Sequence, residues 1–203
     1  MPALFGGMNK SIVFVMTKYI LHGGATSQES LHNKNFSIEM LKGLPEPIKI
    51  LVVYFAISKD KWNELMEDDN RKFSKFNPGK KFELTLATDD IKLFKKQISD
   101  SDVIYIRGGR ELVIHQLFKQ IDNLEDLFKG KVIGGSSAGA YTLSKYFYSN
   151  GRDSIEEGTG ILPIKVMAHY SPDKIEPFER LKGYKEDLKM YTIPETEFVV
   201  IEK

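Results

Sequence analysis

The sequence predicts an α/β domain in which a mostly parallel sheet lies between layers of helices. Short apolar segments alternate with longer amphipathic segments along most of the 203 residues, which is the order of a β-α-β chain. Residues 48–56 (IKILVVYFA) are apolar almost without a break, as in parallel strands that are buried on both faces. Ligands of such sheets bind beyond the carboxyl ends of the strands. Three expected strands end there in paired glycines: Gly23-Gly24, Gly108-Gly109 and Gly134-Gly135.

Each element follows from its own local pattern. The expected strands cover residues 18–24, 48–56, 82–87, 103–109 and 131–135. The expected helices cover residues 27–44, 59–76 (as one helix or two), 89–98, 111–129 and 138–149. Asp89 or Asp90 is the expected N-cap of the helix over 89–98, and Gly130 is placed to stop the helix over 111–129. Residues 150–160, rich in Gly, Asp and Glu, are expected to form a surface loop.

The composition excludes several classes of function. The formal net charge is +1, so the chain has no electrostatic footprint for a nucleic acid or a membrane partner. There is no cysteine, which removes disulfides, thiolate metal sites and a cysteine nucleophile. No apolar run approaches the roughly 20 residues that span a bilayer. We therefore expect one cytoplasmic domain over residues 1–203, with residues 1–15 as a possible N-terminal extension.

The segment Gly135-Ser-Ser-Ala-Gly139 fits the G-x-S-x-G pattern of a nucleophile elbow. In an elbow, a strand turns abruptly into a helix, and the residues two before and two after the nucleophile are small because backbone passes close to them. This register selects Ser137 over Ser136. The backbone N–H of Ala138 then becomes a candidate oxyanion donor. A glycine-rich turn that binds phosphate, or that only packs tightly, is the competing interpretation.

A serine nucleophile needs a base, and the chain has four histidines. His32 lies in a polar stretch, and His115 lies in an expected helix among apolar neighbours. His22 ends the first strand and could reach the edge of a site. His169 follows the apolar run 161–167 and is the best candidate. The four are scattered without metal-ligand spacing, so we expect neither a metal nor another cofactor. The carboxylates that could orient the base are Asp153, Glu156, Glu157, Glu195 and Glu197.

The order of serine, histidine and carboxylate, with four local motifs, resembles the S51 peptidase family, which contains aspartyl dipeptidase (peptidase E) and cyanophycinase. Residues 106–112 (IRGGREL) look like its Gly-Gly-Asn-Thr segment, and residues 135–140 (GSSAGA) look like its nucleophile motif. Residues 160–163 (GILP), with His169 six residues beyond the proline, resemble its histidine segment. Residues 193–196 (IPET) resemble the Leu-Pro-Glu-Gly segment of peptidase E.

The resemblance implies a set of catalytic residues. Ser137 would be the nucleophile, His169 the base and Glu195 the orienting carboxylate. The Gly109 N–H would be the second oxyanion donor. One description of the family gives the carboxylate role to an aspartate between the serine and the histidine, and Asp153 is the nearest equivalent here. The implied fold is a three-layer α/β/α domain similar to class I glutamine amidotransferases.

The resemblance also implies a function. We expect a serine exopeptidase, acting as a monomer or homodimer, that hydrolyses short peptides with N-terminal Asp through an acyl-enzyme. A cyanophycinase-like or isoaspartyl amidase is an alternative, and so is a catalytically silent amidotransferase-like binding protein. An Asp side chain needs a cationic partner. Lys174 and Arg180 follow the histidine and could supply it, although both also suit a solvated helix face. Arg110 is a third candidate, and it stands where the family usually has Asn.

Overall fold

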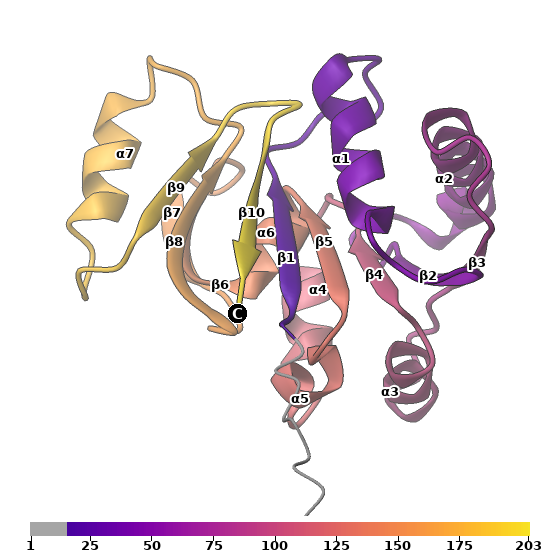
Figure 1. Ribbon diagram of the computed structural model, residues 1–203. Coiled ribbons are helices and arrows are strands. Elements are labelled where there is room, and N and C mark those ends of the chain that lie inside the picture. Colours follow the sequence, from indigo (N-terminus) through magenta and orange to yellow (C-terminus); the bar gives the residue numbers. More distant parts are fainter. Residues whose placement is uncertain (1–15) are drawn as a thin grey trace, which may run out of the picture.

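The computed structural model describes residues 16–203 and contains two sheets (Figure 1). The larger sheet has six strands in the order β10-β1-β5-β4-β2-β3. Their bounds are β1 Lys18–His22, β2 Ile48–Val53, β3 Phe82–Leu86, β4 Val103–Ile106, β5 Val132–Ser136 and β10 Phe198–Glu202. Only β10, which pairs with β1, is antiparallel to its neighbour in this sheet. The prediction of a mostly parallel sheet is therefore confirmed. The expected extension over residues 1–15 lies outside the described residues.

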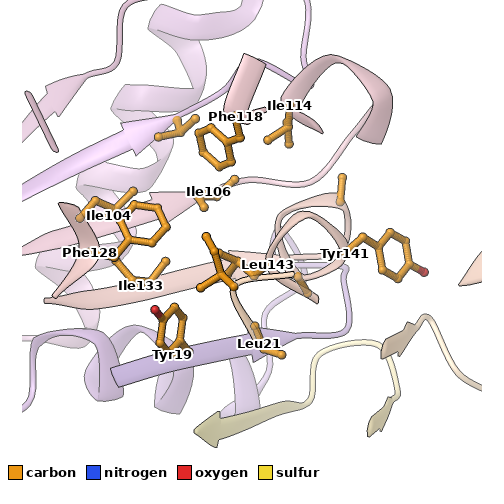
Figure 2. Close-up of a cluster of buried hydrophobic side chains, with 14 of the residues drawn as sticks. Tyr19, Leu21, Ile104, Ile106, Ile114, Phe118, Phe128, Ile133, Tyr141 and Leu143 are labelled. Carbon is orange, nitrogen blue, oxygen red and sulfur yellow. The ribbon is translucent and has the colours of Figure 1, made fainter. Parts of the chain in front are cut away.

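Helices cover both faces of the larger sheet, as predicted. Two of them pack on one face: α1 (Leu31–Leu41) and α2 (Trp62–Phe76). Four pack on the other: α3 (Ile91–Ser99), α4 (Glu111–Phe118), α5 (Leu124–Phe128) and α6 (Ala138–Leu143). Alternation along β1 explains the division, because Tyr19 and Leu21 join one apolar cluster while Ile20 joins the other. Figure 2 shows the first cluster, in which Phe118 lies near Ile106 and Phe128 lies near Ile104 and Ile133.

The second sheet was not predicted. Its four strands have the order β7-β6-β8-β9. Their bounds are β6 Ser144–Ser149, β7 Ser154–Glu157, β8 Leu162–Ala168 and β9 Met190–Ile193. The predicted helix over 138–149 is therefore wrong in its second half, which is a strand rich in β-favouring aromatic residues. The predicted loop over 150–160 is wrong over β7, which pairs antiparallel with β6. Helix α7 (Ile175–Lys182) packs against this sheet.

Several helix ends differ from the expected bounds for local reasons. The helix expected over 111–129 is two helices, α4 and α5, separated by a turn in which Asn123 has a φ of 58°. Helix α1 begins only after Ser30, whose side chain accepts a hydrogen bond from the N–H of Asn33. Asp90 is the N-cap of α3, as predicted. A single 3₁₀ turn (Lys59–Lys61, η1) precedes α2. Among residues 16–203, none of these helices has the length and apolar character needed to cross a membrane.

The topology brings the carboxyl ends of β1, β4 and β5 side by side. Gly23-Gly24 and Gly108-Gly109 follow β1 and β4, as the sequence predicted. The third glycine pair lies within β5, which continues to Ser136. This edge of the sheet, together with the loop after β8, carries the candidate site.

Candidate active site

Ser137 occupies the sharp turn between β5 and α6. Its backbone has a φ of 50° and a ψ of −109°, a conformation that costs free energy for a residue with a Cβ and that persists only where packing enforces it. The two flanking glycines show that packing. A Cβ on Gly139 would lie 2.4 Å from the Ile106 carbonyl oxygen, and one on Gly135 would lie 2.8 Å from the carbonyl carbon of Gly139. Ser136 is buried, whereas Ser137 is half-buried. The observed backbone thus has the register expected of an elbow centred on Ser137.

His169 follows β8 and faces Ser137. Its Nε2 lies 2.7 Å from Ser137 Oγ. The backbone of His169 is also left-handed, with a φ of 54°. The imidazole ring packs directly on Gly24, where a Cβ would lie 2.2 Å from ring atom Cε1. Only glycine at that position leaves room for the ring.

Glu195 lies in the turn between β9 and β10. Its Oε1 is 3.1 Å from His169 Nδ1. A carboxylate oxygen can only accept here, so Nδ1 carries the proton and Nε2 is left to accept from the Ser137 hydroxyl. The two side chains are partly open to water, with exposed fractions of 31% for His169 and 54% for Glu195. Serine, imidazole and carboxylate therefore form one continuous line of contacts.

Asp153, the alternative carboxylate, lies in a different set of contacts. It accepts hydrogen bonds from the Tyr148 hydroxyl and from Arg180 Nη1. The hydrogen bond from Tyr148, followed by the charge of Arg180, lowers the pKa of the Asp153 carboxyl. The structure brings Glu195 to His169, and it places Asp153 in the turn between β6 and β7.

The two expected oxyanion donors belong to segments that contact Ser137. Ala138 is the first residue of α6, and Gly109 lies in the turn after β4, next to Gly108. A Cβ on Gly108 would lie 2.8 Å from the Ser137 Cβ, so the β4 turn passes directly over the serine. Within residues 16–203, neither the Gly109 nor the Ala138 N–H donates a backbone hydrogen bond outside the regular elements.

The three candidate cations differ in their partners. Lys174 donates to the backbone carbonyl of His169 and to Asn150 Oδ1. Arg180 forms a salt bridge with Asp153. Arg110 is exposed at the start of α4 and has no salt bridge to the described residues 16–203. Of the three candidates, only Arg180 has a carboxylate partner within that part of the chain; Lys174 has two neutral acceptors there, and the Arg110 side chain has neither a hydrogen bond nor a salt bridge there.

The remaining histidines take different environments. His32, in its polar stretch, is exposed. His115 is half-buried, and burial lowers its pKa. His22 is fully buried and makes a 2.8 Å hydrogen bond to Asn33; Asn33 was not singled out by the sequence. Among residues 16–203, no cluster of His, Cys, Asp and Glu side chains has a geometry suited to a metal ion.

Comparison with known proteins identifies the family of the chain. The model of peptidase family S51 matches residues 19–203. A crystal structure of a peptidase from an acI-B1 actinobacterium is similar, with a TM-score of 0.65 and 19% identity over 93% of this chain and 84% of that one. A crystal structure of a putative peptidase E protein from Listeria monocytogenes EGD-e has a TM-score of 0.61 and 18% identity, over 93% of this chain and 98% of that one. No curated protein matches. At these identities the two structures show a shared fold, and the family match extends over nearly the whole chain: this protein belongs to peptidase family S51.

Proposed function

We propose that this member of family S51 is a serine peptidase that hydrolyses short peptides through Ser137, His169 and Glu195. The observation that carries the proposal is the line of contacts from Ser137 Oγ to His169 Nε2, at 2.7 Å, and from His169 Nδ1 to Glu195 Oε1, at 3.1 Å. These are the distances and roles of a nucleophile, a general base and a group that orients the base. The left-handed backbone of Ser137 presents its hydroxyl at the carboxyl edge of the sheet.

The reaction follows from these positions. Ser137 Oγ attacks the carbonyl carbon of the scissile peptide bond while His169 Nε2 takes the hydroxyl proton. The Glu195 carboxylate stabilises the imidazolium that forms. The imidazolium then gives its proton to the leaving amine as the C–N bond breaks, which leaves an acyl ester on Ser137. A water molecule, activated by the same imidazole, hydrolyses the ester and restores the hydroxyl.

The charge that develops on the carbonyl oxygen needs donors that are already in place. We assign this role to the N–H groups of Gly109 and Ala138. Ala138 follows Ser137 at the start of α6, and Gly109 follows Gly108 in the turn after β4. The close approach of Gly108 to Ser137 supports this assignment, because it fixes the β4 turn against the nucleophile.

For the substrate, we propose dipeptides with N-terminal Asp, with Arg110 as the partner of the Asp carboxylate. Arg110 adjoins the proposed oxyanion donor Gly109. Arg180 and Lys174 already have partners, in Asp153 and in the His169 carbonyl oxygen. A guanidinium group also suits two-point recognition of a carboxylate better than an ammonium group does.

A labelling experiment tests the serine mechanism. The wild type, Ser137→Ala and Ser136→Ala would be treated with a fluorophosphonate, and the labelled peptide would be located by mass spectrometry. We expect labelling and peptide hydrolysis in the wild type and in Ser136→Ala, and neither in Ser137→Ala. Equal loss in both variants would refute the register. A wild type that is folded but neither labelled nor active would indicate a catalytically silent binding protein.

A substrate comparison tests the choice of peptide. We expect Asp-Leu to be cleaved much faster than Asn-Leu or Ala-Leu. Arg110→Gln should lower kcat/KM for Asp-Leu by at least about tenfold, the effect of losing one charge-assisted contact, and should change Asn-Leu little. Lys174→Gln and Arg180→Gln are the matched comparisons. Equal cleavage of Ala-Leu and Asp-Leu would contradict the acidic specificity, and preferred cleavage of a multi-Asp-Arg polymer would favour the cyanophycinase-like alternative.

A further inference from the structure

One short segment at the end of β1 is hydrogen-bonded to all three loops of the candidate triad. We call residues 22–24 the strand-end segment. The N–H of Ser137 donates to the His22 carbonyl at 2.9 Å, and the N–H of His169 donates to the Gly23 carbonyl at 2.9 Å. The N–H of Thr196, the residue after Glu195, donates to the Gly24 carbonyl at 3.0 Å. The N–H of Gly23 in turn donates to the Glu197 carbonyl at 2.9 Å. The relative positions of nucleophile, base and carboxylate loop therefore depend on the conformation of this one segment.

The His22 side chain folds back on the same segment and fixes its shape. Its Nδ1 accepts the N–H of Gly24 at 3.0 Å, so the ring proton is on Nε2, and Nε2 donates to Asn33 Oδ1 at 2.8 Å. The ring is fully buried and packs on Phe36 with 4.5 Å between ring centroids. Gly24 itself has a φ of 128°, which is a conformation that needs such support.

Asn33 extends this support from α1 to the loop that follows the strand-end segment. Its Nδ2 donates to the Ala25 carbonyl at 2.9 Å and to the Gln28 carbonyl at 2.7 Å. The side chain of Asn33 is buried, and its acceptor and both of its donor hydrogens are used. A buried polar group of this kind is costly to leave unpaired, so the network favours one arrangement of residues 22–28.

We propose that His22 and Asn33 are positioning residues for the serine chemistry. They touch none of the reacting atoms. They act through the strand-end segment, which sets the distance from Ser137 Oγ to His169 Nε2. This inference rests on the proposed function. Because a displacement of about 1 Å can cost on the order of 100-fold in rate, loosening the segment should lower kcat and leave KM nearly unchanged.

The test compares two buried asparagines. Asn33→Ala removes the network, whereas Asn77→Ala removes a buried side chain that donates to Ser37 Oγ and the Phe73 carbonyl, both in the α1–α2 region. Steady-state kinetics with the best dipeptide and thermal unfolding would be measured for both, with Ser137→Ala in the same assay. We expect Asn33→Ala to lose 10- to 100-fold in kcat with KM within threefold, and Asn77→Ala to keep kcat within twofold at a similar loss of thermal stability.

A rescue experiment separates positioning from general damage. His22→Ala should resemble Asn33→Ala, and His22→Gln should recover part of kcat because its amide can still donate to Asn33 Oδ1. Asn33→Asp keeps the acceptor for His22, and it replaces Asn33→Ala in the kinetic comparison if Asn33→Ala does not fold. If Ser137→Ala is inactive but Asn33→Ala and Asn77→Ala have equal kcat, or if His22→Gln recovers nothing, the positioning role is overturned and the proposed function stands. If Ser137→Ala remains active, both are overturned.

Discussion

Glu195→Gln is the substitution that tests the triad most directly. Glu195 contacts His169 Nδ1 at 3.1 Å through one carboxylate oxygen, and glutamine has nearly the same shape without the charge. The change should leave the fold intact, because Glu195 lies in an exposed turn. It should remove the attraction that stabilises the imidazolium as Ser137 loses its proton. The loss should therefore fall mainly on kcat.

The exposure of the pair sets the size of the effect. A buried triad carboxylate contributes on the order of 10⁴ to kcat. Here the side chain of Glu195 is 54% exposed and that of His169 is 31% exposed, so water screens the pair. Two unit charges about 4 Å apart attract by about 1 kcal/mol at the dielectric constant of water and by about 4 kcal/mol at an effective value of 20. We expect an intermediate value of about 2–3 kcal/mol, which is a loss of about 30- to 150-fold in kcat.

The assay is steady-state hydrolysis of Asp-Leu, with Asp153→Asn as the matched control. Asp153 is bonded to Tyr148 and Arg180, so its amide variant should keep kcat within about threefold. Circular dichroism and thermal unfolding would verify that both variants fold. A nearly unaffected Glu195→Gln together with an inactive Asp153→Asn would refute the reasoning, and the orienting role would then pass to Asp153.

Three further predictions concern packing and pH. Gly24→Ala places a Cβ 2.2 Å from the His169 ring at a φ that disfavours alanine; we expect loss of peptide hydrolysis in a folded protein, and retained activity would contradict the packing. Burial lowers the pKa of His22 from 6.5 to about 4, so only the unfolded state takes up this proton as the pH falls from 6.5 to 4. This protonation should lower the unfolding free energy of the wild type by about 3 kcal/mol between pH 6.5 and 4, as measured by urea unfolding, and His22→Gln should lack that loss. Parallel curves of unfolding free energy against pH for the two proteins would contradict the prediction. Phe118→Ala, at a core position that is 1% exposed, should cost about 3–5 kcal/mol in the same measurement, and a loss below 1 kcal/mol would mean that the core repacks.

The parts of the site that could be predicted are those whose constraints are local. The elbow could be predicted because Gly135, Ser137 and Gly139 lie within five residues of one another and constrain one another sterically. Only the contact of Gly139 with Ile106 is distant in sequence. The strands of the larger sheet could be predicted because burial on both faces requires nearly continuous apolar runs, as in β2. His169 could be selected because it follows the apolar run 161–167 downstream of the elbow, and the family resemblance then supported that choice.

The second sheet could not be predicted because its constraints are not local. The segment Ser144–Ser149 continues directly from α6, and its apolar and aromatic residues suit a helix or a strand equally well by period alone. Its state is decided by pairing with β8, which lies well downstream in the sequence, and with β7. Tertiary pairing therefore overrode a helical expectation that rested on the elbow template.

The carboxylate shows where local reasoning ends. Local patterns left Asp153, Glu195 and three other acidic residues open, because no local rule connects any of them to His169, and only the family resemblance favoured Glu195. What separates them is the strand-end segment of β1, more than 140 residues before His169. Its middle carbonyl binds the N–H of His169, and its last carbonyl binds the N–H of Thr196, directly after Glu195. One strand end thus brings His169 and Glu195, the candidate base and carboxylate, together. The sequence analysis ranked His22 only as a weaker candidate base. The same contacts support its proposed role in positioning the strand-end segment instead of in proton transfer.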